Sequence, residues 1–309
     1  MSNTKKYDLI CILGPTASGK TSLAVNLANE IDSEIISADS RQVYKGMDIG
    51  TGKDLEEYTI NNKKIPYHLI DIVEAGDKYN VFRFQSDFLD AYNLIKSKNK
   101  TPVLCGGTGM YIEAVTKGYK LIQVPNNEQL RKKLESKSLD ELQEILSSYK
   151  KLHNTSDTDT VKRAVRAIEI AEYYKNNPET DSYYPKINTL FIGVKIERDL
   201  RRKRITERLK QRLQNGMIEE VESLLNNGVP YETLIYYGLE YKYIAQYLKG
   251  ELSKAQMVNS LQTAIHQFAK RQMTWFRKME RQGIKIHWVD FNLPMEDKIS
   301  FVKKHLVSN

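Results

Sequence analysis

Residues 14–21 form the pattern with the clearest chemistry in the chain. They read Gly14-Pro15-Thr16-Ala17-Ser18-Gly19-Lys20-Thr21, a complete G-x-x-x-x-G-K-[ST] loop. The glycines let the backbone turn tightly and point several N–H groups inward, the lysine adds a point charge, and the final hydroxyl can reach Mg²⁺. The pattern therefore predicts a cradle for a phosphorylated ligand, without specifying which ligand.

Two further candidates follow other apolar runs. Asp39 ends the run EIISAD and is followed by Ser40 and Gln42. A carboxylate at this place can serve as a general base or a metal ligand, although Asp and Ser are also favoured as helix N-caps. Gly106-Gly107-Thr108 follows the run TPVLC. It can bring backbone N–H groups and one hydroxyl against the same ligand, and the alternative for it is a plain turn.

Basic residues cluster in three places. Residues 198–212 hold eight Lys or Arg against two acids, and Arg204 and Arg208 share one helix side, where an anion would relieve their repulsion. In residues 267–277 cations alternate with aromatic rings, which suits stacking on nucleic-acid bases or simple core packing. Lys162, Arg163 and Arg166 lie at helical spacing and are expected to face RNA or to form surface ion pairs.

Alternating strand and helix signals position these candidates. Short apolar runs typical of buried parallel strands span Tyr7 to Leu13, Glu34 to Asp39 and Thr101 to Cys105. Helices are predicted from Thr21 to Glu30 and from Phe82 to Ser97. This alternation predicts an α/β fold with a parallel sheet flanked by helices. Because ligands bind beyond the carboxyl ends of such strands, the candidate groups are expected to converge on one crevice.

The rest of the chain predicts an insertion followed by a return to the sheet. From about Asn126 to Asn177 the sequence is charged and helical, which indicates an inserted lobe. A strand is predicted from Leu190 to Ile196, and long amphipathic helices from Arg201 to Asn226 and from Val258 to Glu280. A terminal strand is expected from Ile284 to Val289. The expected domain boundaries are 1–122 for the first part of the core, 123–186 for the lobe and 187–309 for the second part of the core.

Composition limits the class of protein. The chain has 309 residues, of which 40% are hydrophobic and 28% charged, and a net charge of +8 suggests an acidic partner. Cys11 and Cys105 lie within apolar runs, so we expect packing residues rather than a disulfide or a zinc site. No apolar run reaches membrane-spanning length and the N-terminus lacks an apolar signal segment, which predicts a cytoplasmic protein without membrane contact.

Five motifs spread over nearly the whole chain resemble those of the bacterial tRNA dimethylallyltransferase family, also called IPP transferases. The motifs are residues 14–21, Asp39-Ser40-x-Gln42-x-Tyr44-Lys45-Gly46-Met47-Asp48-Ile49-Gly50-Thr51, His68-Leu69-Ile70-Asp71, Gly106-Gly107-Thr108-Gly109-x-Tyr111 and Ala269-Lys270-Arg271-Gln272-x-Thr274-Trp275. The run after Asp39 is the specific one, because many unrelated nucleotide-binding proteins share the phosphate loop. The resemblance implies a P-loop NTPase-like sheet with an inserted all-helical lobe.

The resemblance also implies an activity. A dimethylallyl group would pass from dimethylallyl diphosphate to the exocyclic amine of the adenosine 3′-adjacent to a tRNA anticodon. Asp39 matches the family's base, Thr108 matches a residue near the reacting centre, and Arg208 would stabilise the leaving diphosphate, with Mg²⁺ near Thr21. The implied diphosphate-binding set is Gly14, Thr16, Ala17, Ser18, Gly19, Lys20, Thr21 and Arg208.

The implied partner is the anticodon stem-loop of tRNA, with the protein acting as a monomer. A stacked adenine cannot reach a buried donor, so it must be flipped into a channel. The residues expected to contact tRNA are Asp39, Ser40, Gln42, Arg163, Arg166, Lys270, Arg271 and Gln272.

The chain departs from the family pattern in three places. Gly238-Leu239-Glu240 stands where the family usually has Gly-Tyr and a basic residue, and Ile265-His266 stands where it usually has Thr-Arg. His153 to Asp159 replaces the usual His-Pro-Asn-Asp. These changes are expected to alter contacts with phosphate or RNA. Three other functions stay open at this point: an adenylate isopentenyltransferase, a small-molecule kinase that uses ATP, and a non-catalytic RNA-binding module.

Overall fold

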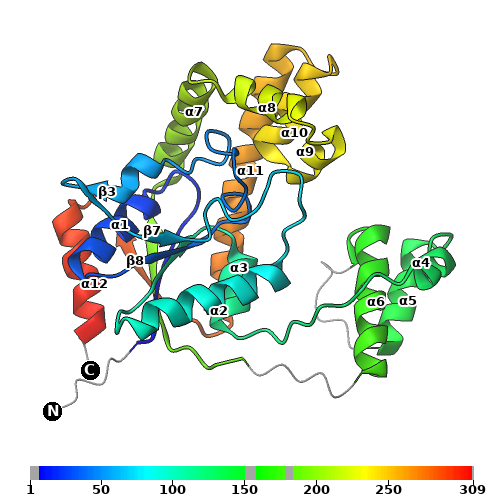
Figure 1. The fold of residues 1–309 in the computed structure, drawn as a ribbon, viewed down its shortest axis with the longest axis horizontal. Coiled ribbons are helices and arrows are strands. Elements are labelled where there is room, and N and C mark those ends of the chain that lie inside the picture. The colour runs from blue at the N-terminus through cyan, green and yellow to red at the C-terminus, as the bar shows by residue number, and fades with distance from the viewer. Residues whose placement is uncertain (1–6, 150–157, 178–183, 308–309) are drawn as a thin grey trace. The chain divides into compact units, whose positions relative to one another are not determined.

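The chain folds into two compact units. The computed structural model describes residues 7–149, 158–177 and 184–307 (Figure 1). Residues 1–118 and 186–309 belong to one unit, here called the core unit, and residues 119–185 belong to the other, the helical lobe. The altered segment at 153–157 lies outside the described residues. Within the described part of the chain, no helix combines the length and apolar character needed to cross a membrane.

A six-stranded sheet forms the centre of the core unit. Its order is β5-β2-β6-β1-β7-β8, and each neighbouring pair is parallel. The strands are β1 (Leu9–Leu13), β2 (Ile35–Ala38), β5 (Tyr67–His68), β6 (Val103–Gly106), β7 (Thr189–Lys195) and β8 (Ile286–Asp290). The register aligns Leu13 and Ala38 with Gly106, so three strands end at the same level. The predicted parallel sheet is therefore confirmed.

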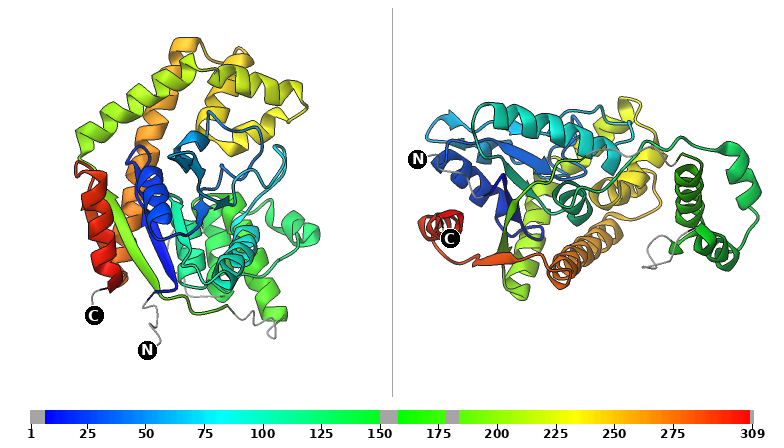
Figure 2. Two further views of the ribbon diagram at one scale, coloured as in Figure 1. Left: turned by 60° about the vertical axis from the view of Figure 1, so that its left-hand side comes forward. Right: turned by 90° about the horizontal axis from the view of Figure 1, so that it is seen from below.

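Helices cover both faces of the sheet, as Figure 2 shows. On one face lie α1 (Lys20–Glu30) and α12 (Met295–Val307), and on the other lie α2 (Val81–Ser97) and α3 (Gly109–Thr116). All five residues of β1 are buried, because side chains on both faces meet helices. Ile10 and Ile12 belong to the apolar cluster that includes Leu23 and Leu27 of α1. This two-sided burial explains why the strands are continuous apolar runs in the sequence.

Short elements connect β2 to β5. They are the 3-10 helix η1 (Leu55–Tyr58) and the antiparallel pair β3 (Thr59–Ile60) and β4 (Lys63–Lys64). Tyr58 is buried and packs edge-on against Tyr67 at the sheet edge. The connection therefore packs beside the edge strand β5, and Tyr58 also faces the cavity that contains the phosphate loop.

The last third of the core unit is mostly helical. It contains α7 (Arg198–Gln214), α8 (Met217–Asn226), α9 (Tyr231–Tyr237), α10 (Leu239–Leu248) and α11 (Lys254–Arg281). The prediction of one helix from Arg201 to Asn226 was wrong, because the helix is interrupted at Gly216. This residue has a φ of 98°, a left-handed conformation that glycine adopts readily and that ends α7 before α8 begins. The break lets α8 turn toward α10, which it contacts.

The helical lobe has an apolar core of its own. It contains α4 (Glu128–Leu134), α5 (Leu139–Tyr149) and α6 (Val161–Asn176). Leu142, Leu146 and Ile168 are fully buried between the helices. Glu169 is also buried, and Arg131 donates two hydrogen bonds of 3.0 Å to its carboxylate. A charged cluster is thus built into the side of a small hydrophobic core.

Candidate active site

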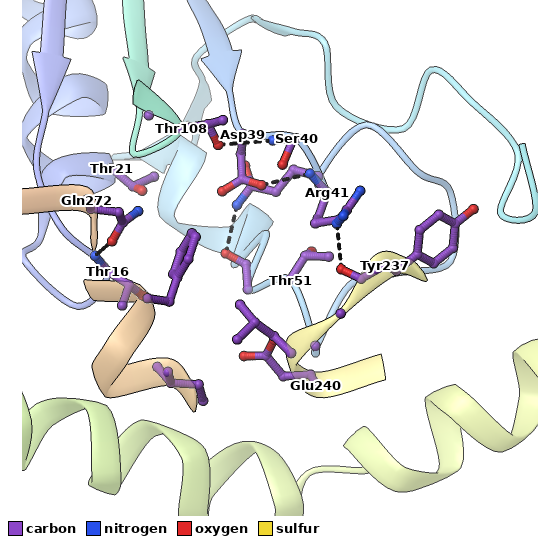
Figure 3. A pocket seen from close by; sticks show the side chains of 18 of the residues that line it. Thr16, Thr21, Asp39, Ser40, Arg41, Thr51, Thr108, Tyr237, Glu240 and Gln272 are labelled. Atoms are coloured by element: carbon purple, nitrogen blue, oxygen red, sulfur yellow. Dashed lines mark hydrogen bonds between the residues drawn. The ribbon is translucent and has the colours of Figure 1, made fainter. Parts of the chain in front are cut away.

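The predicted site residues meet in a cavity at the carboxyl edge of the sheet. The cavity has a volume of about 240 Å³ and is drawn in Figure 3. The ends of β2 and β6, the phosphate loop, α7, α10 and α11 all contribute to its walls. Site residues predicted from the sequence that line it are Thr16, Lys20, Thr21, Asp39, Ser40, Gln42, Gly106, Thr108, Arg208 and Gln272.

The phosphate loop joins β1 to α1 and has the backbone shape of an anion cradle. Ala17 and Gly19 both have positive φ angles, of 63° and 74°. A Cβ atom on Gly14 would lie 2.6 Å from Ser18 Oγ, so only glycine leaves room for this turn. The first turn of α1 receives no side-chain cap, and Ser18 Oγ is buried without a hydrogen-bond partner within the described residues. Donors are therefore oriented inward before a ligand binds.

Lys20 places a cation at the floor of this cradle. Burial disfavours its charged form and lowers its pKa below the usual value, against the opposing effect of Asp39 and other nearby acids. A bound anion would stabilise the charged form of this buried ammonium group. The lysine is thus suited to a phosphate ligand.

Asp39 follows β2 directly and begins a turn rather than a helix. Its Oδ1 accepts a hydrogen bond of 2.9 Å from the backbone N–H of Arg41, and Figure 3 shows the carboxylate at the cavity. Ser40 donates its backbone N–H to Thr108 Oγ1 at 3.4 Å. The helix N-cap alternative is wrong, because Asp39 is followed by turn residues at 40–43 and no helix begins there. The bond to Arg41 is an Asx turn, which fixes one carboxylate oxygen.

Gly106 and Gly107 bring β6 close to its neighbours. A Cβ atom on Gly106 would lie 2.4 Å from the carbonyl oxygen of Ala38, and one on Gly107 would lie 2.3 Å from Gln272 Nε2. Both distances are far below van der Waals contact. The two glycines therefore let Thr108 approach the end of β2, where Asp39 begins.

Two glutamines predicted to contact tRNA hold parts of the site together. Gln272 accepts a bond of 2.8 Å from the Thr16 N–H and donates one of 3.0 Å to the Gly107 carbonyl. Gln42 accepts from Ser37 Oγ at 3.1 Å and donates to the Gly52 carbonyl at 3.1 Å. Both ends of each side-chain amide thus have protein partners. Contact of these two residues with tRNA stays a prediction.

Two arginines of α7 lie beside the phosphate loop. Arg208 lines the cavity and pairs with Asp54, the residue before η1. Arg204 donates from Nε to the Ala17 carbonyl at 3.1 Å, and its guanidinium lies 4.8 Å from the Phe291 ring centre. Arg204 therefore supports the loop instead of being an idle surface charge. The role of Asp54 was not predicted, since the sequence offers no sign of a partner 154 positions away.

Two charged residues that sequence reasoning missed hold the segment after Asp39. Glu220 of α8 accepts hydrogen bonds from the backbone N–H groups of Asp48, Ile49 and Gly50 at 2.8, 2.6 and 3.0 Å. Lys53 is almost fully buried and donates to the Tyr44 carbonyl at 2.7 Å. Its ammonium also pairs with the carboxylates of Asp48 and Asp71. The segment that carries the most specific motif is thus fixed at several points.

The departures at 238–240 and 265 fall on the cavity wall. Leu239, Glu240 and Ile265 all line it. Gly238 and Leu239 have positive φ angles of 76° and 42° where α9 ends and α10 begins. Burial raises the pKa of Glu240, and neighbouring Arg212 opposes that rise. An acid therefore stands inside the site, close to an arginine.

Other predicted residues lie away from the cavity. Lys270 and Arg271 are exposed on α11. Arg163 and Arg166 belong to the helical lobe: Arg163 pairs with Asp159 at 2.9 Å, and Arg166 pairs with buried Glu169. The ion-pair alternative holds for both arginines, and their contact with tRNA stays a prediction.

Metal ligands are sparse in the site. The described residues contain no group of three or more His, Cys, Asp or Glu side chains that could hold a metal ion. Thr21 and Asp39 line the same cavity and offer one hydroxyl and one carboxylate. This donor set suits Mg²⁺ only when the ion arrives with phosphate oxygens and keeps several waters.

Comparison with known proteins agrees with this geometry. The family model described as IPP transferase matches residues 42–279, and one described as isopentenyl transferase matches residues 7–67. The chain is 64% identical over 300 residues to tRNA dimethylallyltransferase 2 of Bacteroides fragilis, covering 97% of this chain and 98% of that one. It is 62% identical to the protein of that name from Phocaeicola vulgatus, with 96% of each chain covered.

A solved structure gives the same result at the level of the fold. The tRNA isopentenylpyrophosphate transferase of Bacillus halodurans superposes with a TM-score of 0.71 at 32% identity, covering 97% of both chains. The similarity extends over both parts of the core unit and the lobe. Sequence, fold and relatives agree, and the chain belongs to the IPP transferase family.

Proposed function

We propose that this chain transfers a dimethylallyl group from dimethylallyl diphosphate to the exocyclic amine of the adenosine 3′-adjacent to the anticodon of tRNA. The products would be isopentenyladenosine and diphosphate. Family membership and relatives named tRNA dimethylallyltransferase along nearly the whole chain support the proposal. The single observation that carries it is that Asp39 and the phosphate loop face one cavity from the ends of β2 and β1.

The cavity supplies the groups that such a displacement needs. The bond between the allylic carbon and the diphosphate oxygen breaks, and the electron pair leaves with the diphosphate. The adenine nitrogen forms the new bond to that carbon, and its proton passes to Asp39. Lys20 and backbone N–H groups of the phosphate loop stabilise the charge on the leaving group, and Arg208 adds a cation already held by Asp54.

Thr108 and the turn at Asp39 position the base. The hydroxyl of Thr108 accepts from the Ser40 N–H, and the Arg41 N–H holds one oxygen of Asp39. The second carboxylate oxygen is then free to take a proton in a fixed direction. Mg²⁺ would be held by Thr21 together with the diphosphate and would help to neutralise the leaving group.

Basic surfaces would bind the tRNA. Lys270 and Arg271 on α11 are exposed, and in the lobe Arg163 has 62% of its side chain exposed. Such side chains suit phosphate contacts, and the adenine would be flipped into the cavity. We also propose that the protein acts as a monomer, and its proposed tRNA substrate supports a place in the cytoplasm.

A transfer assay tests the proposal. The purified chain is incubated with dimethylallyl diphosphate, Mg²⁺ and unmodified tRNA, and the tRNA is digested and examined by mass spectrometry. We expect a five-carbon addition at the adenosine after the anticodon, abolished in Lys20→Ala. If no tRNA in a total tRNA pool gains mass, the proposed function is wrong.

A second acceptor has one observation in its favour. The isopentenyl transferase model matches residues 7–67, which hold the phosphate loop and Asp39. Prenylation of a free adenine nucleotide would use the same groups. Competition between AMP and tRNA for labelled donor separates the two functions, and we expect the label to appear in tRNA. The family match gives no support to ATP-dependent kinase activity.

A further inference from the structure

Arg212 is a buried cation with an unused hydrogen-bond donor. Only 15% of its side chain is exposed, although it lies on a helix rich in surface arginines. Its Nη2 atom is buried and makes no hydrogen bond within the described residues. Leaving such a donor without an acceptor is costly, and more so when the group is charged. The side chain is therefore prepared for a partner that is not part of the described protein.

The surroundings of Arg212 fix the direction of its guanidinium. A Cβ atom on Gly52 would lie 1.5 Å from Nη2 of Arg212 and 2.8 Å from Nη2 of Arg208, so both arginines pack against the bare backbone of Gly52. Asp54 lies 4.0 Å from Arg212 but is already paired with Arg208. The carboxylate of Asp54 is thus shared by two guanidinium groups, and Nη2 of Arg212 has no hydrogen-bond acceptor within the described residues.

Arg212 lies beside the phosphate loop. Arg212 lines three cavities that adjoin this loop, and in each of them Arg208 is also present. Lys20 and Thr21 line two of the three. The surfaces that share Arg212 therefore also share the residues expected to hold the diphosphate.

Glu240 is the acid of α10 that shares two cavities with Arg212. Both residues line the main cavity and a small neighbouring cavity of about 20 Å³. The acid favours the charged form of Arg212, while Arg208 and burial act against it and lower the pKa of Arg212. Ile205 and Leu209 add apolar walls to this small cavity.

We propose that Arg212 is an additional diphosphate-binding residue and that Glu240 is its positioning residue. The inference rests on the proposed function and adds one cation to the diphosphate site. It also gives the acid at position 240 a role, because Glu240 shares the cavity wall with a cation from α7. Glu240 then holds the guanidinium of Arg212 in place for the diphosphate.

Binding of inorganic diphosphate in the presence of Mg²⁺ tests this proposal directly. Isothermal titration calorimetry compares the full chain with Arg212→Met, Arg212→Lys and Glu240→Gln. We expect Arg212→Met to weaken binding by about 10- to 100-fold, the size of one charge-assisted hydrogen bond. Arg212→Lys recovers part of this loss, and Glu240→Gln weakens binding by a smaller factor. In transfer assays, KM for dimethylallyl diphosphate rises in Arg212→Met while KM for tRNA stays unchanged.

Two further variants complete the test: a matched control, and a double variant that moves the positive charge from α7 to α10. Arg202→Met removes an exposed arginine from the same helix and is expected to leave diphosphate binding within two-fold. Arg212→Met combined with Glu240→Lys returns the cation to α10 and should restore most of the affinity. If Arg212→Met binds diphosphate as wild type does, the proposal is overturned. If the double variant stays weak, the two positions do not serve one phosphate.

The outcome is separable from that of the proposed function. If the wild type binds diphosphate in a Lys20-dependent way but modifies no tRNA, the proposed function fails while the Arg212 comparison still stands. If tRNA is modified and the Arg212 variants bind diphosphate normally, only the inference fails. A variant with a lowered unfolding temperature is replaced by Arg212→Lys, which keeps the charge and most of the volume.

Discussion

At the scale of single residues, Asp39 combines two tasks on one carboxylate. One oxygen holds the turn through the Arg41 N–H, and the other is the one that the proposed function assigns to the proton of the acceptor amine. The two tasks differ in what they require. The turn needs only an acceptor oxygen, whereas proton transfer needs a base.

This difference gives a prediction for Asp39→Asn. The amide keeps an oxygen for the Arg41 N–H but cannot take the proton, so kcat should fall by about 10²- to 10⁴-fold while tRNA affinity stays within two-fold. Asp39→Ala should lose the turn as well and show an additional loss of affinity. Single-turnover prenylation and filter binding of tRNA measure the two effects. Full turnover in Asp39→Asn would exclude this residue as the base.

The sequence predicted the residues that line the cavity better than the residues that support them. The phosphate loop, Asp39 and Thr108 belong to local patterns whose meaning depends on neighbouring residues only, and the structure brings them together. Asp54, Lys53 and Glu220 act through partners on distant elements, and no local pattern reports such a pairing. Gln272 was assigned to RNA contact because it stands among cations, while the structure places its amide between Thr16 and Gly107.

At the scale of elements, the segment between β2 and η1 depends on α8 for its shape. Glu220 accepts three consecutive backbone N–H groups and the hydroxyl of Tyr241 at 2.8 Å. Gly50, Thr51 and Gly52 of this segment line the cavity. The position of α8 itself follows from the break at Gly216. Because α7 and α8 were predicted as one helix, the sequence did not reveal that Glu220 of α8 supports the site.

We predict that Glu220→Gln loosens this segment. A glutamine has one acceptor oxygen, and its NH₂ group meets donors that need an acceptor. Unfolding free energy should drop by about 1.5–3 kcal/mol, the effect of losing a hydrogen bond to a charged group, and kcat/KM should fall by roughly ten-fold. Urea denaturation and the transfer assay provide the measurements. Glu222→Gln, an exposed change on the same helix, is the control and should match wild type.

At the scale of the whole molecule, the helical lobe depends on charge for part of its stability. Burial opposes ionisation of Glu169, but hydrogen bonds from Arg131, the Asn127 N–H and Arg166 outweigh it and lower the pKa to about 2. A depressed carboxyl pKa stabilises the fold fully above the ordinary value of 4.5, and this contribution disappears as the pH falls toward 2. The contribution is on the order of 3 kcal/mol at neutral pH.

Glu169→Gln should therefore destabilise the lobe more at pH 7 than at pH 3. At pH 7 amide exchange in α5 and α6, followed by mass spectrometry, should be faster in the variant than in wild type. At pH 3, after correction for the intrinsic exchange rate, the difference should be clearly smaller. Glu144→Gln changes an exposed acid of α5 and serves as the control. A difference of equal size at both pH values would contradict the role of the buried charge.

The placement of the two tryptophans has a practical consequence for following this protein in solution. Trp275 packs where a Cβ of Gly109 would lie 2.3 Å from its ring, and Trp288 packs against Gly193 in the same way. Both belong to the core unit, and residues 119–185 contain no tryptophan. Intrinsic indole fluorescence therefore reports on the core unit alone. Trp275 lies close to the proposed site, because it packs against Gly109 and follows Gln272 by three residues. We expect binding of the proposed donor to change this emission without an added dye, and the lobe contributes no indole background.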